Sequence, residues 1–191
     1  MSRIAIIVGH PDTDAFSSSV AKWYEESAEN SGHQIELIHL AKLSFDPILH
    51  KGYSKEQKLE KDLERAQSTI QWAEHLVIIY PNWWGSMPAL LKGFFDRVML
   101  PGFAFKFDEK KKRSVGLLKG KTARIILLMR QKPAEYREKY PYAGETVKHS
   151  ILEFCGIKPV TMTEIGPAER LDEAYRKKWE KIIRKLAVVA K

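Results

Sequence analysis

The sequence is poor in the features that mark disulfide-bonded or membrane-spanning proteins. Its 191 residues include a single cysteine, Cys155, so an internal disulfide is excluded. The apolar residues around Cys155 predict a small buried side chain. The apolar run from Ile4 to Val8 is too short to span a membrane. We therefore expect a cytoplasmic protein without membrane insertion.

Familiar phosphate-binding motifs are also missing. The segment after Gly9 contains no G-x-G-x-x-G, the fingerprint of dinucleotide-binding folds. Gly120-Lys121-Thr122 resembles the end of a P-loop, but Val115 stands where the first glycine belongs, and a predicted strand follows the segment. Both mononucleotide and dinucleotide fingerprints are therefore excluded, and we predict no metal site.

The positive charge comes without a nucleic-acid motif. The chain has 32 Lys and Arg against 24 Asp and Glu, a formal net charge of +8, and much of the excess lies between Lys106 and Lys121. No basic–aromatic alternation accompanies it, so we expect no nucleic-acid partner. A solvated loop is the favoured interpretation of this cluster, and attraction of a phosphorylated cofactor or another anionic ligand is the alternative.

What the sequence does contain is an alternation of strand and helix patterns. Five strands alternating with helices imply right-handed crossovers and a parallel sheet covered on both faces. For one domain spanning 1–191, with an irregular excursion at about 101–120, the simplest doubly wound α/β order is the flavodoxin-like 2-1-3-4-5. The strands are predicted at 3–9, 34–39, 75–80, 123–129 and 160–165, and the helices at 17–31, 55–73, 88–99, 144–154 and 171–189.

In that strand order, the loops after the first and third strands open a crevice at the carboxyl edge of the sheet. The first of these loops brings His10, Ser17, Ser18 and Ser19 to the start of a helix. Helix N-terminal N–H groups and the helix dipole favour a phosphate there. The alternatives are that Ser17 only caps the helix and that His10 is hydrogen-bonded scaffolding.

The second loop contains two adjacent indoles. Pro81, Asn82, Trp83 and Trp84 follow the third strand, where ordinary packing does not require them. Their flat faces suit a planar ligand such as the isoalloxazine ring of a flavin. Alternatively, one Trp covers the end of the sheet and the other packs in a subunit interface. The convergence of both loops on one switch point favours the ligand.

These motifs resemble those of the flavodoxin-like NAD(P)H:quinone oxidoreductases, which include bacterial modulators of drug activity and ancillary proteins of potassium-efflux systems. The resemblance implies that a flavin phosphate lies against His10, Phe16, Ser17 and Ser19, and that Pro81 to Trp84 contact the isoalloxazine. It rests on His10-Pro11 with Phe16-Ser17, on Pro81-Asn82-Trp83-Trp84 continued by Pro88 to Val98, and on Pro101 to Phe105.

The resemblance also implies an activity. It predicts a homodimeric enzyme that passes a hydride by a ping-pong mechanism from NAD(P)H, through FMN or FAD, to a planar quinone-like acceptor. FMN is slightly favoured because no segment reads as an adenine pocket. One alternative is a flavodoxin-type electron carrier, against which the positive charge argues. The other is a regulatory ancillary subunit that contacts a membrane transporter peripherally.

The sequence departs from the family after the fourth predicted strand. Where the family carries Thr-Thr-Gly-Gly or Asp-Thr-Pro-Pro, this chain reads Met-Arg-Gln-Lys-Pro-Ala-Glu-Tyr from 129 to 136. Arg130 and Lys132 would place cations near the flavin. Tyr136 and Tyr142, together with Tyr140, are candidates for a family-like proton relay, of which we select Tyr136 and Tyr142 as catalytic.

Overall fold

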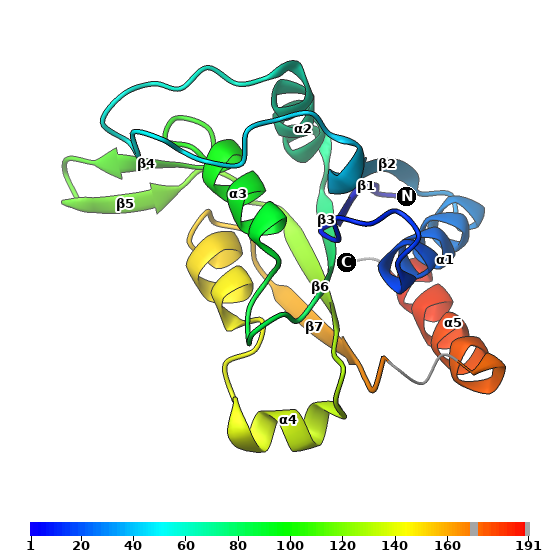
Figure 1. The fold of residues 1–191 in the computed structure, drawn as a ribbon. Coiled ribbons are helices and arrows are strands. Elements are labelled where there is room, and N and C mark those ends of the chain that lie inside the picture. The colour runs from blue at the N-terminus through cyan, green and yellow to red at the C-terminus, as the bar shows by residue number, and fades with distance from the viewer. Residues whose placement is uncertain (169–171, 190–191) are drawn as a thin grey trace.

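The computed structural model describes residues 1–168 and 172–189. Its main sheet confirms the predicted doubly wound topology, with five parallel strands in the order β2-β1-β3-β6-β7 (Figure 1). That order is the predicted 2-1-3-4-5 when the sheet's own strands are counted along the chain. The strands are β1 (Arg3–Val8), β2 (Gln34–His39), β3 (His75–Pro81), β6 (Thr122–Leu128) and β7 (Val160–Ile165).

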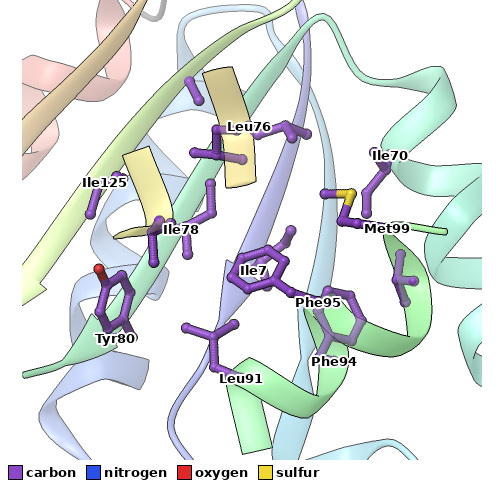
Figure 2. Close-up of a cluster of buried hydrophobic side chains, with 14 of the residues drawn as sticks. Ile7, Ile70, Leu76, Ile78, Tyr80, Leu91, Phe94, Phe95, Met99 and Ile125 are labelled. Atoms are coloured by element: carbon purple, nitrogen blue, oxygen red, sulfur yellow. The ribbon is translucent and has the colours of Figure 1, made fainter. Parts of the chain in front are cut away.

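Helices cover both faces of this sheet because its central strands are apolar on both sides. In β1, Ile4, Ile6 and Val8 pack with one cluster, and Ala5 and Ile7 pack with the other. The first cluster includes side chains of α1 (Phe16–Asn30) and α5 (Glu173–Val188), and the second includes side chains of α2 (Lys61–Trp72), α3 (Ala89–Val98) and the π-helix η2 (Thr146–Glu153). Figure 2 shows part of the second cluster, where α3 packs on the sheet.

The register of the strands brings three loops to one edge. Val8 pairs with Ile79 across β1 and β3, and Pro81 pairs with Leu128 across β3 and β6. Parallel strands that end in register release their following loops at the same place. The segments after β1, β3 and β6 therefore start side by side at the carboxyl edge of the sheet.

The charged helix before β3 begins later than predicted. It was expected from residue 55, but α2 starts at Lys61. The cause is Arg97 of α3, which is fully buried and donates to the Lys58 carbonyl at 3.0 Å and to Glu60 Oε2 at 2.9 Å. These bonds hold the chain before α2 against α3 in a non-helical conformation.

The excursion at about 101–120, predicted as a loop, contains an antiparallel hairpin of β4 (Phe105–Asp108) and β5 (Arg113–Gly116) that projects beyond the main sheet (Figure 1). The prediction was wrong because Asp108 turns the chain: its Oδ1 accepts from the backbone N–H groups of Lys110 and Lys111, each at 3.1 Å. Nor is the whole basic cluster solvated. Lys121 is buried and its Nζ donates to the carbonyls of Gln71 and Ala73.

The observed helices also differ from the predicted ones in the C-terminal half of the chain. The segment after β6 was read as a loop but contains a short helix, α4 (Pro133–Lys139), with proline in its first turn. The helix predicted from 171 starts as α5 at Glu173, where Asp172 accepts from the Tyr175 N–H at 2.9 Å, while Leu171 lies outside the described residues. In the N-terminal half, a short 3-10 turn, η1 (Leu40–Lys42), follows β2.

The structure also describes the surroundings of Cys155 and the apolar character of the helices. Cys155 is buried as predicted, and burial raises the pKa of its thiol to about 11, so it remains protonated at neutral pH. Among the helices in the described part of the chain, none combines the length and apolar character needed to cross a membrane.

Candidate active site

A cavity of about 490 Å³ lies at the carboxyl edge of the sheet, where the loops after β1, β3 and β6 meet. The predicted residues His10, Phe16, Ser17 and the four residues Pro81 to Trp84 all line it. The third loop contributes Arg130, which the sequence placed near the ligand but could not orient. The remaining lining residues are Ala15, Leu128, Met129 and Ala168.

One end of the cavity is the N-terminus of α1. The N-cap residue is Ala15, which forms no side-chain cap, and the first turn contains no acidic residue. The interpretation of Ser17 as the N-cap is therefore wrong. Ser17 lies inside the helix, is 2% exposed and lines the cavity. A helix start without a cap or a carboxylate leaves backbone N–H groups and a partial positive charge for an anion.

His10 lies in the loop after β1 and contacts the loop after β3. Its Nδ1 accepts a hydrogen bond from the Asp12 backbone N–H at 3.0 Å, so the neutral imidazole carries its hydrogen on Nε2. Its ring also makes an edge contact with the indole of Trp83, at 5.4 Å between centroids. Scaffolding is thus part of the role of His10, and one ring donor remains in the neutral form.

Ser18 and Ser19 are not among the residues that line the cavity. The Ser18 hydroxyl is instead hydrogen-bonded to Nε2 of His39 at 3.0 Å. His39 is buried, and burial, followed by nearby Lys42 and His10, lowers the pKa of its imidazole. The Ser18 hydroxyl therefore contacts His39 of β2, whereas Ser17 and the N-terminus of α1 line the cavity.

The loop after β3 forms a tight hairpin turn around the indoles. Trp83 and Ser86 exchange two backbone hydrogen bonds of 2.9 Å, and Trp84 and Gly85 between them have φ values of 55° and 77°. Two positive φ values identify a type I′ turn, which favours Asn or Gly and is strained with tryptophan. Trp84 is fully exposed, so burial in this chain does not compensate for the strain.

Asn82 supplies a polar group that no described neighbour satisfies. Its backbone N–H donates to the Leu128 carbonyl at 2.7 Å, which fixes the residue between β3 and β6. Its side-chain Oδ1 is buried and has no hydrogen-bond partner among the described residues. An unsatisfied buried acceptor costs about 1–3 kcal/mol. A ligand with a ring N–H, as in the pyrimidine edge of a flavin, would satisfy it.

These observations fit a flavin. The uncapped α1 N-terminus suits its phosphate, the indoles of Trp83 and Trp84 suit its planar ring, and Asn82 Oδ1 offers an acceptor for a ring N–H. Because all three features line one cavity, one ligand can contact them together.

A second cavity of about 470 Å³ adjoins the first and shares Asn82, Trp84 and Arg130 with it. Tyr136 of α4 lines this second cavity, as does Tyr140, which was named but not selected from the sequence. Tyr142 is 77% exposed and lines neither cavity. The sequence did not identify Gln131 as a lining residue, because its position depends on how the loop packs on Gly166.

Comparisons with known proteins agree with this architecture. The profile of a family described as having a flavodoxin-like fold matches residues 2–186. Over 180 residues the chain is 28% identical to an "uncharacterized NAD(P)H oxidoreductase" of Haemophilus influenzae, covering 90% of this chain and 87% of the relative. It is 28% identical over 183 residues to the ribosyldihydronicotinamide dehydrogenase (quinone) of Mus musculus, covering 82% of this chain and 78% of the relative.

A solved structure gives the same result. The crystal structure of Smu.1420 from Streptococcus mutans superposes with a TM-score of 0.82 at 28% identity, covering 97% of this chain and 98% of that protein. The chain thus belongs to the family of proteins with a flavodoxin-like fold, and its resemblance to NAD(P)H:quinone oxidoreductases is confirmed.

Proposed function

We propose that the protein is a flavin-dependent NAD(P)H oxidoreductase that reduces a quinone-like acceptor in two alternating half-reactions. The observation that carries this proposal is that the uncapped N-terminus of α1 and the exposed indole of Trp84 line one cavity. The relatives named as NAD(P)H oxidoreductase and quinone dehydrogenase support the same activity.

The overall reaction consumes NAD(P)H, one proton and a quinone, and yields NAD(P)⁺ and a hydroquinone. A bound flavin supplies a ring that accepts a hydride from the donor and later gives it to the acceptor. The chain's own task is to hold and orient the reactants and to exclude water from them. FMN is the favoured flavin, because one uncapped helix N-terminus provides for one terminal phosphate.

The residues divide this task by chemistry. Ser17 and the first N–H groups of α1 bind the phosphate, and Trp83 and Trp84 contact the flat ring. Asn82 Oδ1 accepts from a ring N–H, while Nε2 of His10 and the guanidinium of Arg130 stabilise negative charge that develops during reduction. Tyr136 is the favoured proton donor to the acceptor, since it lines the adjoining cavity and Tyr142 does not.

We also propose that the enzyme is a homodimer of the cytoplasm. Aromatic side chains near the β4–β5 hairpin support the dimer: Tyr53, Phe107 and Phe154 are 66%, 57% and 45% exposed. An exposed apolar surface of this kind is typical of a protein–protein contact. Light scattering coupled to size-exclusion chromatography tests it, and a monomer at micromolar concentration contradicts it.

The function is tested by purifying the protein, releasing any bound cofactor by denaturation, and identifying it by chromatography. Acceptor-dependent oxidation of NADH and NADPH is then measured with a panel of quinones. We expect FMN and stoichiometric oxidation. Retention of neither FMN nor FAD contradicts the proposal, and bound flavin without NAD(P)H oxidation assigns the protein to electron carriers instead.

A pair of variants tests the role of the indole. Trp84→Ala should weaken flavin binding about tenfold, because a lost aromatic stacking contact is worth about 0.5–1.5 kcal/mol beyond its area. Trp84→Phe keeps a flat ring and should retain most of the affinity. Unchanged flavin affinity and turnover in Trp84→Ala would show that the indole does not contact the reactants.

A further inference from the structure

The second cavity adjoins the candidate flavin site but does not include the phosphate-binding end. It has a volume of about 470 Å³ and lacks Ser17 and Phe16 among its lining residues. The lining residues that it does not share with the first cavity are Gly85, in the turn after β3, and Gln131, Tyr136 and Tyr140, in the segment after β6. A ligand in this cavity therefore lies next to the indole of Trp84 and away from the N-terminus of α1.

Aromatic rings line this cavity from two different elements. Trp84 comes from the turn after β3, while Tyr136 lies in α4 and Tyr140 directly follows it; the ring centroids of the two tyrosines are 5.0 Å apart with a 41° tilt. A Cβ added at Gly85 would lie 3.4 Å from the Tyr136 hydroxyl, so α4 and the turn are in close proximity. Aromatic walls of this kind favour a planar ligand.

The charge of the cavity is one-sided. Among the described residues that line either cavity, Arg130 is the only Lys or Arg, and no Asp or Glu is present. Two other cations of this segment point to carboxylates elsewhere: Lys132 Nζ lies 2.8 Å from Glu135 Oε1, and Arg137 Nη1 lies 2.7 Å from Glu164 Oε2. The guanidinium of Arg130 has five N–H donors, so it can bind an anion in addition to contacts within the chain.

We propose that the second cavity binds the electron acceptor and selects planar aromatic acceptors that carry a carboxylate or sulfonate, which pairs with Arg130. This inference rests on the proposed function, since it assigns the acceptor class of the same enzyme. A guanidinium binds such groups through charge-assisted, bidentate hydrogen bonds, which are stronger than neutral ones. An uncharged quinone would use the aromatic walls alone.

The phosphates of the nicotinamide donor are the other anionic source that could meet Arg130. The aromatic walls favour the acceptor, because Trp84, Tyr136 and Tyr140 suit a planar ring and the volume of about 470 Å³ is in the range of small-molecule sites. The test therefore includes donors with and without phosphates.

The experiment measures binding of two redox-inert probes, 2-naphthalenesulfonate and 2-naphthalenesulfonamide, to the flavin-loaded protein by isothermal titration calorimetry. The wild-type protein should bind the sulfonate about tenfold more tightly than the uncharged sulfonamide, and added salt should reduce the difference. Arg130→Gln should remove the preference, and Arg130→Lys should keep part of it. Lys132→Gln, which removes a neighbouring cation paired with Glu135, is the matched control and should leave the preference unchanged.

Turnover provides a second measurement. The ratio of kcat/KM for a sulfonated naphthoquinone to that for its uncharged parent should fall about tenfold in Arg130→Gln, following the binding preference. Equal binding of the two probes by flavin-loaded wild type, or a preference that persists in Arg130→Gln, overturns the inference. The inference is also overturned if Arg130→Gln raises KM for NADH, but not for 1-benzyl-1,4-dihydronicotinamide, while the acceptor preference stays.

The outcomes separate this inference from the function on which it rests. A protein that retains no flavin, or that oxidises no NAD(P)H with any quinone, contradicts the proposed function. A protein that retains flavin and reduces quinones without a preference for the anionic probe contradicts only the assignment of Arg130.

Discussion

The two edges of the central sheet use polar side chains in opposite ways. At the amino edge, His75 starts β3 and its Nδ1 lies 2.6 Å from Thr122 Oγ1 of β6, while Lys121 donates to the carbonyls that end α2. Both His75 and Lys121 are buried. At the carboxyl edge, Trp84 is fully exposed on a strained turn, and Asn82 Oδ1 has no partner among the described residues.

The difference shows which polar groups serve the fold and which are kept for a ligand. At the amino edge, His75 Nε2 has no partner among the described residues, but His75 Nδ1 and Lys121 Nζ are bonded within the chain and both residues are buried, so their replacement should change stability and leave ligand binding intact. Groups at the carboxyl edge are exposed or unsatisfied, so their replacement should change ligand binding and leave stability nearly intact. Acidification and two sets of variants can break or sharpen this contrast.

The largest effect should come from acidification at the amino edge. Burial, followed by the charges of Arg124 and His33, lowers the pKa of His75 from 6.5 to about 4. Between these values the unfolded chain binds a proton that the folded protein does not, so stability falls as the pH drops from 6.5 towards 4. The full shift corresponds to about 3 kcal/mol of unfolding free energy.

Urea denaturation at several pH values between 7.5 and 4.5 measures this loss. His75→Asn keeps a polar group near Thr122 and removes the titration, so its stability should depend less on pH in that range. His50→Asn, at an exposed histidine, is the control and should retain the wild-type dependence. An equally steep dependence in His75→Asn would show that another group causes the loss.

The next effect concerns Lys121. Lys121→Met keeps the apolar stem but removes the donor to the carbonyls of Gln71 and Ala73. Leaving such groups without a charged donor should destabilise the protein by about 2 kcal/mol, measured by urea denaturation. Lys119→Met, at an exposed lysine nearby, should have little effect. Reduced flavin binding in folded Lys121→Met would contradict the separation of the two edges.

The fold was predictable where local pattern and global topology agree. Apolar runs such as Ile4 to Val8 can bury both faces only in a covered parallel sheet, so the five strands and their order followed from the sequence. The start of α2 did not, because it depends on Arg97, which lies 37 positions beyond Glu60. Contacts between distant residues leave no periodic signal in the segment they reshape.

The candidate site was predictable to a similar extent. His10, Ser17 and Trp84 could be placed together because their loops follow neighbouring strands. The sequence pattern could not distinguish the role of Ser18 from that of Ser17, because the partner of the Ser18 hydroxyl, His39, lies on a different strand, β2. The choice between Tyr136, Tyr140 and Tyr142 depended on α4, whose position is set by tertiary packing at Gly166.

The smallest effect tests whether the carboxyl edge sacrifices stability for its indole. Trp84→Asn places asparagine before Gly85, the pair that type I′ turns favour, and should stabilise the protein by about 0.5–1 kcal/mol relative to Trp84→Ala. Both variants remove the indole, so both should lose flavin affinity to a similar degree. Urea denaturation and flavin titration of the two proteins measure these effects separately. Equal stability of the two variants would show that the positive φ of Trp84 carries no strain, and the turn would then be explained by its hydrogen bonds alone.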